Sequence, residues 1–371
     1  AGTGRAMNVK RVGAIAGRIA LVLASILVVL GALEVTLRWR PTLLGQAFAN
    51  GAASKYTLRP GGIYYSDRAL GMRFMLPNHR TTMYYNGYVW QHETDALGFR
   101  NKPLHVPADV VLLGDSVVYG HGVDFEHTIG HYLERRTGLR VANLGRQADC
   151  AFQEAYLLTE YLPVFRPRVV VHVFTANDIE DLYVLLRDEA MHAFLAQPVE
   201  RITYPPRTDP ATLLAERERD ARRRSLRSWA KQELYVMKMF RWLDYRFRQW
   251  RRTAAVTVAE AASAHSRRYD PDEVNRDPES LGWRYTAHAL AYMKHLSDRA
   301  GARLVMVPLA RDRQLEILRS IAARHAIDLV DTSALYAGPS FLPNDGHFTP
   351  HGARTMADLI AADIARQPPP R

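Results

Sequence analysis

The sequence contains a single cysteine, Cys150, in 371 residues. One cysteine can form neither an internal disulfide framework nor a cysteine-based zinc site, so both are excluded. The chain also lacks a P-loop and a Gly-x-Gly-x-x-Gly fingerprint, the usual signs of nucleotide and dinucleotide binding. We find no internal repeats. No cofactor is therefore expected.

Acidic residues are few in one stretch of the chain. The formal net charge is +11, and +9 of it lies between Arg217 and Arg252, where there are 13 Lys and Arg residues and 4 Asp and Glu residues. This is a local basic segment in a chain that is otherwise nearly neutral. No known nucleic-acid-binding module surrounds it, so nucleic acid is not expected as a partner. An apolar content of 47% is enough to build a large core.

One long apolar run lies near the N-terminus. Residues Ile19–Leu37 are apolar apart from Ser25, Glu34 and Thr36. As a helix this run is about 28 Å long, close to the thickness of a bilayer core. More basic residues precede the run than follow it, which places the N-terminus in the cytoplasm by the positive-inside rule. They are Arg5, Lys10, Arg11 and Arg18 before it, and Arg38 and Arg40 just after it.

This pattern predicts a single-pass protein of the inner membrane. Residues 1–18 would lie in the cytoplasm, residues 19–37 would contact membrane lipid, and the main domain would be periplasmic or otherwise extracytoplasmic. A cleaved signal peptide is the competing interpretation, because Ala47-Phe48-Ala49 has the small-x-small form of a processing site. That site lies too far beyond the apolar run for normal processing, so we expect an uncleaved anchor.

After residue 105 the chain has the alternating pattern of an α/β domain. Residues 41–104 are rich in Tyr, Gly and Pro and predict an extended lead-in of short strands and loops. Strands are predicted at 110–113, 141–144, 169–174, 303–307 and 328–330, and helices at about 127–137, 153–162, 281–300, 313–325 and 352–365. Strands separated by helices indicate right-handed βαβ units and a parallel sheet. The domain is assigned to 105–185 and 280–366, with a basic helical insertion at 186–279.

Gly114-Asp115-Ser116 directly follows the first of these strands. A serine just past the carboxyl end of a parallel strand, at a turn into a helix, is where an α/β fold presents a reactive group. The tripeptide alone is also ordinary turn chemistry, and Asp115 is expected to cap or brace the turn. Three further motifs occur later in the chain. They are Asn143-Leu144-Gly145, Thr175-Ala176-Asn177-Asp178 and Asn344-Asp345-Gly346-His347.

With these four motifs in this order, the chain resembles the SGNH (GDSL-like) hydrolase family, and in particular its membrane-anchored bacterial members. The segment Thr94–Arg100, TDALGFR, is similar to the lead-in of those members. The resemblance implies an α/β fold of three layers with a central parallel sheet. Here that domain would carry one N-terminal transmembrane helix and a long helical insertion.

The resemblance also implies roles for individual residues. Ser116 would be the nucleophile, His347 the base that takes its proton, and Asp345 the residue that orients His347. The oxyanion would be bound by the backbone N–H groups of Ser116 and Gly145 and by the side-chain amide of Asn177. No metal and no cofactor belong to this set.

Two positions depart from the family's pattern. Its usual Gly-x-Asn-Asp is Thr175-Ala176-Asn177-Asp178 here, which removes a residue tolerant of positive φ. The family's acid usually stands three residues before the histidine, where this chain has Asn344. The acid here is Asp345, two residues before His347, a spacing also found in similar polysaccharide O-acetyltransfer and esterase domains.

Histidines elsewhere offer a weaker signal for a metal site. His127 and His131 are spaced by one helical turn, with His121 nearby. The glutamate of the zinc-protease motif does not follow His127, and the helix is expected to cover the sheet, so no metal site is predicted. His351 is interpreted as a loop residue beside the catalytic histidine.

The basic insertion contains an apolar stripe at three- and four-residue steps. It consists of Leu226, Trp229, Val236 with Met237, Phe240, Leu243, Phe247 and Trp250, and is interrupted by Glu233. This periodicity predicts one continuous helix over Leu226–Trp250 with the edge formed by Trp229, Phe240, Phe247 and Trp250 buried. The helix either packs on its own domain or docks on anionic headgroups or other membrane-protein subunits.

Two functions of different classes follow. The first is a membrane-anchored extracytoplasmic serine ester hydrolase or O-acyltransferase that acts on an acylated envelope glycan or a lipid-type ester through Ser116, His347 and Asp345. The second is an accessory subunit of a larger membrane complex, such as an energy-converting assembly, in which the SGNH-like site is idle or secondary. Because a fold does not fix a substrate, the site itself has to decide between them.

Overall fold

The structure, a computed structural model, describes residues 3–53, 62–85, 88–223, 225–244, 246–247, 269–343 and 345–367. The chain divides into two compact units. Unit 1 comprises Ala1–Ala53 and Arg222–Thr257, and unit 2 comprises Ser54–Ala221 and Val258–Arg371. The predicted insertion at 186–279 is therefore shared between the two units.

Unit 2 is built on a sheet of five parallel strands in the order β6-β5-β7-β8-β9. The strands are β5 (Val110–Leu113), β6 (Val141–Asn143), β7 (Val169–Thr175), β8 (Arg303–Leu309) and β9 (Asp328–Leu329). Each lies within two residues of its predicted position, and the predicted central parallel sheet is confirmed. Short runs of buried Val and Leu produce these strands because both faces of a parallel sheet are covered.

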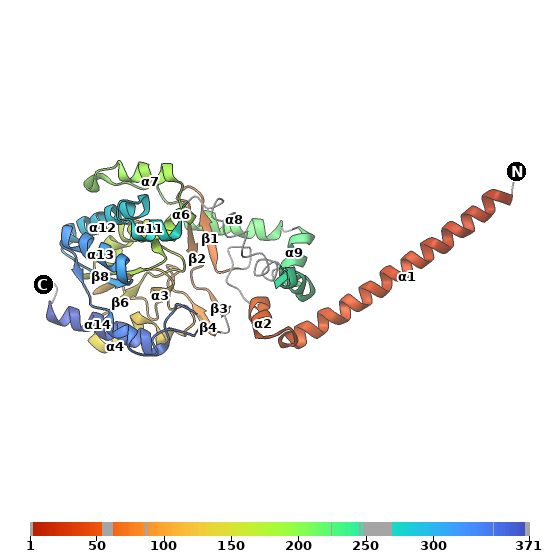
Figure 1. Cartoon of the computed structure of the whole chain (residues 1–371), viewed down its shortest axis with the longest axis horizontal. Coiled ribbons are helices and arrows are strands. Elements are labelled where there is room, and N and C mark those ends of the chain that lie inside the picture. The colour runs from red at the N-terminus through yellow and green to blue at the C-terminus, as the bar shows by residue number, and fades with distance from the viewer. Residues whose placement is uncertain are drawn as a thin grey trace. The chain divides into compact units, whose positions relative to one another are not determined.

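Helices cover both faces of the sheet, which gives the three predicted layers (Figure 1). Side chains alternate along β5, so Val110 and Leu112 enter one core while Val111 and Leu113 enter the other. The first core also contains residues of α4 (Ile129–Thr137) and α14 (Pro350–Arg366). The second contains residues of α5 (Ala151–Phe165), α12 (Leu281–Arg299) and α13 (Asp312–Arg324).

One helix begins two residues later than predicted, for an identifiable reason. The helix expected to begin near His127 begins at Ile129, because Thr128 has extended backbone and its hydroxyl accepts the N–H of His131. The three residues Phe125–His127 form the separate 3₁₀ turn η2. His127 and His131 therefore do not lie on one helix.

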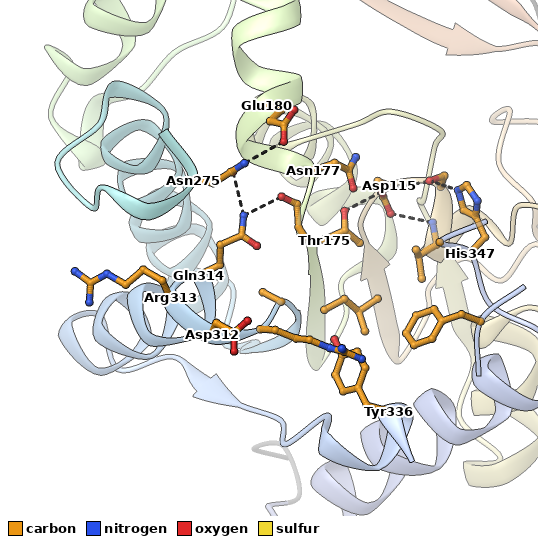
Figure 2. Close-up of a pocket in the computed structure, with 18 of the residues that line it drawn as sticks. Asp115, Thr175, Asn177, Glu180, Asn275, Asp312, Arg313, Gln314, Tyr336 and His347 are labelled. Carbon is orange, nitrogen blue, oxygen red and sulfur yellow. Dashed lines mark hydrogen bonds between the residues drawn. The ribbon is translucent and has the colours of Figure 1, made fainter. Parts of the chain in front are cut away.

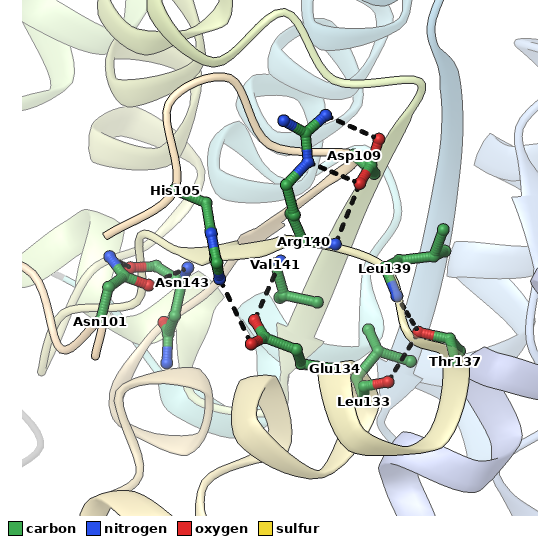
Figure 3. Close-up of polar contacts among 10 residues, drawn as sticks. All are labelled: Asn101, His105, Asp109, Leu133, Glu134, Thr137, Leu139, Arg140, Val141 and Asn143. Atoms are coloured by element: carbon green, nitrogen blue, oxygen red, sulfur yellow. Dashed lines mark hydrogen bonds and ion pairs between the residues drawn. The ribbon is translucent and has the colours of Figure 1, made fainter. Parts of the chain in front are cut away.

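Side chains also close the edge of the sheet at β6 (Figure 3). Asn101 accepts the backbone N–H of Asn143 at 2.7 Å and donates to its carbonyl at 3.2 Å, so a side chain occupies the place of a sixth strand. Where β5 and β6 begin, Asp109 accepts the backbone N–H and the guanidinium of Arg140 at 3.0–3.1 Å. These contacts fix the register of the two strands that precede the predicted site.

The order of the strands determines where a site can form. The direction of strand addition reverses at β5, which has β6 on one side and β7 on the other. In open parallel sheets, ligands bind beyond the carboxyl ends of the strands at such a switch point. Ser116 follows β5 and Asn177 follows β7, so the fold brings these two motifs to one place.

The lead-in is only partly extended. Residues 64–93 form two antiparallel hairpins, as expected. They are β1 (Tyr64–Asp67) with β2 (Met72–Met75), and β3 (Arg80–Tyr85) with β4 (Tyr88–Glu93). Residues 41–53 are helical instead, in η1 (Pro41–Leu44) and α2 (Gln46–Ala53). Phe48 and Ala52 of α2 are buried in unit 1, which explains why this part of the lead-in adopts a helix.

The remaining helices belong mostly to the insertion. In unit 2 they are α6 (Asp178–Leu185), α7 (Asp188–Leu195), η3 (Val199–Arg201), α8 (Pro210–Arg222) and α11 (Pro271–Arg276). Arg222, the last residue of α8, is counted with unit 1. Figure 1 shows α11 beside α12 and α6.

Unit 1 contains the apolar N-terminal helix. Helix α1 (Thr3–Trp39) includes a stretch, Gly17–Trp39, that is long and apolar enough to cross a membrane and is exposed over most of its length. Near its end, Leu37 is buried in a small core with Phe48, Val236 and Met239. The end of α1 is therefore packed into the folded unit.

The expectation of one continuous helix over Leu226–Trp250 was wrong. Helix α9 (Leu226–Glu233) ends before Leu234, and a second helix occupies 235–244. The Glu34 carboxylate of α1 accepts the N–H groups of Tyr235 and Val236 at 3.1 and 2.8 Å. This carboxylate replaces the carbonyls of the preceding turn and so begins a new helix.

Within the described residues of this chain, the predicted aromatic edge is not buried. Trp229, Phe240 and Phe247 are 43%, 50% and 54% exposed, and Trp250 lies outside the described residues. Val236 and Met239 are buried in their place. Periodicity found an apolar stripe, but which part of it is covered depends on the contact with α1.

Candidate active site

The turn after β5 presents Ser116. Gly114 has φ +156°, and a Cβ at this position would lie 2.4 Å from the Val118 side chain, so the turn requires glycine. Asp115 follows, and its carboxylate accepts the N–H of Val117 at 2.8 Å at the start of α3 (Ser116–Tyr119). The expectation that Asp115 caps the turn is confirmed. Ser116 thus becomes the first residue of a short helix.

The structure brings Ser116, His347 and Asp345 together. The Ser116 hydroxyl lies 2.7 Å from Nε2 of His347. On the other side of the ring, Nδ1 contacts the Asp345 carboxylate, which also accepts the backbone N–H of His347 at 3.1 Å. If Nδ1 carries the proton, Nε2 is free to accept the Ser116 proton, which is the arrangement of a nucleophile and its base.

A tight loop allows an acid two residues before His347 to reach the histidine ring. Leu342 donates its N–H to the carbonyl of His347 at 2.8 Å, and Asp345 donates its N–H to the carbonyl of Leu342 at 3.0 Å. These two bonds fold the loop back so that the Asp345 carboxylate meets the ring two residues later. Asn344, at the position where the family usually has its acid, lies outside the described residues.

Two of the three predicted oxyanion donors are placed suitably. The amide of Asn177 donates one hydrogen to Asp181 at 2.7 Å, which leaves its second hydrogen for a ligand. Ser116 is the first residue of α3, so its N–H has no acceptor within that helix. Figure 2 shows Asn177 beside Asp115, Thr175 and His347.

The geometry does not favour the third predicted donor, Gly145. Its N–H donates to the side-chain carbonyl of Asn143 at 2.8 Å and is therefore already used. A Cβ at Gly145 would lie 2.4 Å from the backbone nitrogen of Tyr119, so glycine is required here for close packing against α3. Three residues further on, Ala148 has φ +57°, a left-handed conformation that is uncommon outside glycine. No backbone hydrogen bond from the Ala148 N–H is found within the described part of the chain.

Arg100, the last residue of the lead-in motif, clamps the turn beyond Ser116. Its buried guanidinium donates to the carbonyls of Tyr119, Gly120 and Val123 at 2.7–3.1 Å and to that of Gln91 at 3.0 Å. Four carbonyls on one cation hold the end of α3 against β4. The sequence motif located this arginine, but only the structure shows that it positions the nucleophile's helix.

His121 is a second residue that the sequence did not assign to the site. Its ring stacks on that of His347, with centroids 4.1 Å apart, and its Nδ1 lies 2.7 Å from the Gln147 amide. Burial and the neighbouring His347 lower the pKa of His121 to about 3. His121 is therefore neutral at physiological pH and does not oppose a positive charge on His347.

Thr175, the departure from the family's glycine, joins two buried acids. Its hydroxyl lies 2.9 Å from the Asp115 carboxyl and 2.6 Å from the Asp178 carboxyl. A hydroxyl has one hydrogen and can donate it to only one of them, so one carboxyl must itself carry a proton. Asp115 also accepts the backbone N–H of Val117 at 2.8 Å, which favours its charged form. Burial raises the pKa of both acids, and that of Asp178 lies well above its ordinary value of 3.8, so we assign the shared proton to Asp178.

We expect Asp178→Asn to fold at least as stably as the wild type at neutral pH. Asparagine offers the same donor and acceptor as a protonated acid. An acid whose pKa is raised in the fold stabilises the protein below its unfolded pKa of about 3.8, and this stabilisation is lost as pH rises through the folded value. The melting temperature of the variant relative to wild type should therefore increase with pH above about 4. Thermal denaturation of the full chain in mild detergent measures it.

Asp149→Asn is the matched control. Asp149 is equally buried but pairs with Arg146 at 2.7 Å. Burial raises its pKa only to about 6, so it is charged at neutral pH. Removing its charge should cost about 3–5 kcal/mol, because it leaves a buried guanidinium unpaired. A comparable loss in Asp178→Asn would show that Asp178 is ionised.

A cleft of about 820 Å³ opens at the site. Figure 2 shows Asp115 and His347 at one end and Asn275 and Arg313 at the other. Gln314 of α13 donates to the carbonyl of Ala176 at 3.0 Å and so supports the loop that carries Asn177. The cleft therefore has a reactive end and a polar end.

The described histidines do not form a separate metal site. His127 contacts the Tyr132 hydroxyl and His131 packs on the Phe125 ring. We expected His351 to be a loop residue. It lies instead in the first turn of α14, where it is exposed. Ligand atoms of His121, Asp345 and His347 do lie within 4.8 Å of one another. A metal there would compete with the contacts of His347 described above.

With four motifs at the carboxyl edge of its parallel sheet, this chain has the SGNH-like fold that the resemblance implied. No family model and no curated protein matches it. Similar solved structures include TesA, which is 11% identical, covers 69% of this chain and 98% of that chain, and has a TM-score of 0.38. A lipase/acylhydrolase from Enterococcus faecalis is 13% identical, with coverages of 71% and 98% and a TM-score of 0.36. The esterase EstA from Pseudoalteromonas sp. is 9% identical, with coverages of 69% and 96% and a TM-score of 0.37. Sequence identities of 9–13% and TM-scores of 0.36–0.38 are too low to transfer an activity, so the function of this chain depends on its own side chains.

Proposed function

We propose that this protein is a membrane-anchored extracytoplasmic serine hydrolase or O-acyltransferase that acts on esters. The observation that supports this most directly is the contact of Ser116 with His347 at 2.7 Å, with Asp345 on the far side of the ring and an open cleft in front. An idle site would have no need to keep all three residues in this geometry.

In the first half of the reaction, His347 takes the proton of Ser116 as the serine oxygen attacks the ester carbonyl. The oxyanion is bound by the N–H of Ser116 and the side-chain amide of Asn177. His347 then gives its proton to the departing alcohol oxygen, and the acyl group remains on Ser116.

In the second half, a hydroxyl group attacks the acyl-serine while His347 takes its proton. Water as the attacking group gives hydrolysis, and an alcohol of a second substrate gives acyl transfer. Ser116 recovers its proton from His347 in both cases. The neutral His121 ring beside His347 favours both halves, because a second positive charge would oppose protonation of His347.

The lining of the cleft combines polar and apolar side chains. Beyond Ser116 it includes Asn275, Arg311 and Gln314, which suit hydroxyl-rich groups better than an alkyl chain. Arg311 stacks its guanidinium 3.8 Å from the centre of the Tyr336 ring, a flat surface of the kind that sugar rings contact. Val117, Leu309 and Phe341 add apolar surface to the same cleft, so both predicted substrate classes, an O-acylated envelope glycan and a lipid-type ester, fit its lining.

The test of this proposal uses the full chain in mild detergent. We expect it to hydrolyse a short-chain aryl acetate and to react with a fluorophosphonate. Mass spectrometry of the labelled protein should place the phosphonate on Ser116.

Contacts at the end of α1 support an anchor that stays in the mature protein. Glu34 begins the helix at 235–244, and Leu37 lies 2% exposed in the core of unit 1. Cleavage at Ala47-Phe48-Ala49 would remove both and would cut through α2. These contacts favour an anchor over a signal peptide.

The orientation predicts the result of a fusion experiment. A reporter that functions only outside the cytoplasm should be active when attached after Arg371, because the basic residues before the span hold the N-terminus inside. A tag at the N-terminus and the C-terminal reporter should be found on one polypeptide. Activity of a cytoplasm-only reporter, or separation of the two ends, would contradict the proposed location.

A further inference from the structure

An apolar stripe on the helix that begins at Tyr235 is buried at one end and about half exposed along the rest of the described residues. Val236, Phe240, Leu243 and Phe247 are spaced by four, three and four residues and share one face. Val236 is 6% exposed because it packs on the end of α1. Phe240, Leu243 and Phe247 are 50%, 44% and 54% exposed. The stripe thus continues past its contact with α1 into half-exposed surface.

The start of this helix is fixed at the end of the membrane-spanning stretch. Besides the two bonds from Glu34, Arg38 pairs with Glu34 at 2.6 Å and donates to the carbonyl of Glu233 at 3.0 Å. Glu34 lies five residues before Trp39, where the stretch ends. At about 1.5 Å per residue, this is within roughly 8 Å of the boundary between acyl chains and headgroups.

The basic side chains near the stripe also suit the boundary between acyl chains and headgroups. Arg227 and Lys231 of α9 and Arg241 and Arg246 of the next helix lie beside the exposed aromatics, in the segment that carries most of the net charge. Aromatic and aliphatic side chains next to Arg and Lys are typical of helices that lie in the interface of an anionic bilayer.

We propose that residues 226–247 form an interfacial arm that lies in the outer membrane–water interface beside α1. Its apolar stripe enters the acyl boundary and its basic side chains contact anionic headgroups. A bilayer is favoured over a protein partner because the arm begins where the anchor leaves the membrane, so lipid already surrounds its first turn. This inference depends on α1 spanning the membrane and is independent of catalysis at Ser116.

The arm can be tested by its depth in a bilayer. Single cysteines at Leu243→Cys, Phe247→Cys and Arg241→Cys would each carry a nitroxide on the full chain, reconstituted alone in vesicles of phosphatidylcholine and phosphatidylglycerol. Wild type is the background control, since Cys150 is buried. Val184→Cys in α6, 70% exposed, is the control for an exposed position in unit 2.

We expect the nitroxides at Leu243 and Phe247 to collide more with oxygen and less with a water-soluble nickel chelate than those at Arg241 and Val184. Chelate accessibility at Leu243 and Phe247 equal to that at Val184 would overturn the proposal and leave this face for a protein partner. Depth should decrease when phosphatidylcholine replaces phosphatidylglycerol. An unchanged depth would overturn the assignment of the basic side chains to headgroups. Hydrolysis of aryl acetate, measured in parallel, reports separately on the proposed reaction.

Discussion

Replacing Ser116 or His347 with alanine should reduce ester hydrolysis by about 10⁴- to 10⁶-fold, because nucleophile and base act as a unit. The double variant should be little worse than either single one. The measurement is kcat/KM for a short-chain aryl acetate, together with labelling by a fluorophosphonate. Both variants should keep the melting temperature of the wild type, since the two side chains meet at the cleft rather than in a core.

Ser66→Ala is the control for the serine, because Ser66 is exposed on β1 of the same unit. It should be as active as the wild type. Equal slow hydrolysis by the wild type and Ser116→Ala would eliminate the proposed enzyme. The accessory-subunit hypothesis would then be tested by gentle purification from the native membrane and identification of the proteins that accompany this chain.

Asp345→Asn should reduce kcat/KM by about 10⁴-fold. The amide that replaces the carboxylate can donate to Nδ1 of His347 and so stabilise the tautomer in which Nε2 carries the proton. That tautomer cannot accept the proton of Ser116. The effect should persist across the pH range in which the wild type is active, because it arises from the position of a proton on the ring.

Asp331→Asn provides the comparison, since Asp331 is exposed and its described hydrogen bonds are to the backbone and side chain of Ser333. It should have wild-type activity. Full activity in Asp345→Asn would mean that the two-residue spacing does not orient His347, and that the fold supports catalysis without this acid.

The reactive residues could be predicted because each residue of a suitable chemical type directly follows a recognisable strand or belongs to a recognisable motif. A run of Val and Leu made β5 recognisable as a buried parallel strand, and the serine after it had to lie at the carboxyl edge of the sheet. Asn177 follows the neighbouring strand for the same reason. His347 was found through its motif, and the loop bonds of Leu342 show why Asp345 can replace Asn344 as the acid.

The donors around the oxyanion were less predictable. A motif shows that Gly145 is required, but it does not show whether its N–H or its lack of a side chain is the reason. In the structure the N–H is bonded to Asn143 and the missing side chain lets the loop approach Tyr119. Similarly, no local pattern indicates that Thr175 joins Asp115 to Asp178, because the two acids are 63 residues apart in the chain.

The sequence alone determined the elements whose signals are local. Strand positions follow from runs of buried side chains, the span from the length of an apolar run, and the nucleophile from the strand that it follows. The tertiary structure decided what depends on residues distant in sequence. Glu34 divides a helix that periodicity predicts as continuous, because its carboxylate binds N–H groups 201 and 202 residues away. The contact with α1 covers Val236 and leaves Phe240 exposed, since periodicity defines a face but only a packing partner determines how much of it is buried.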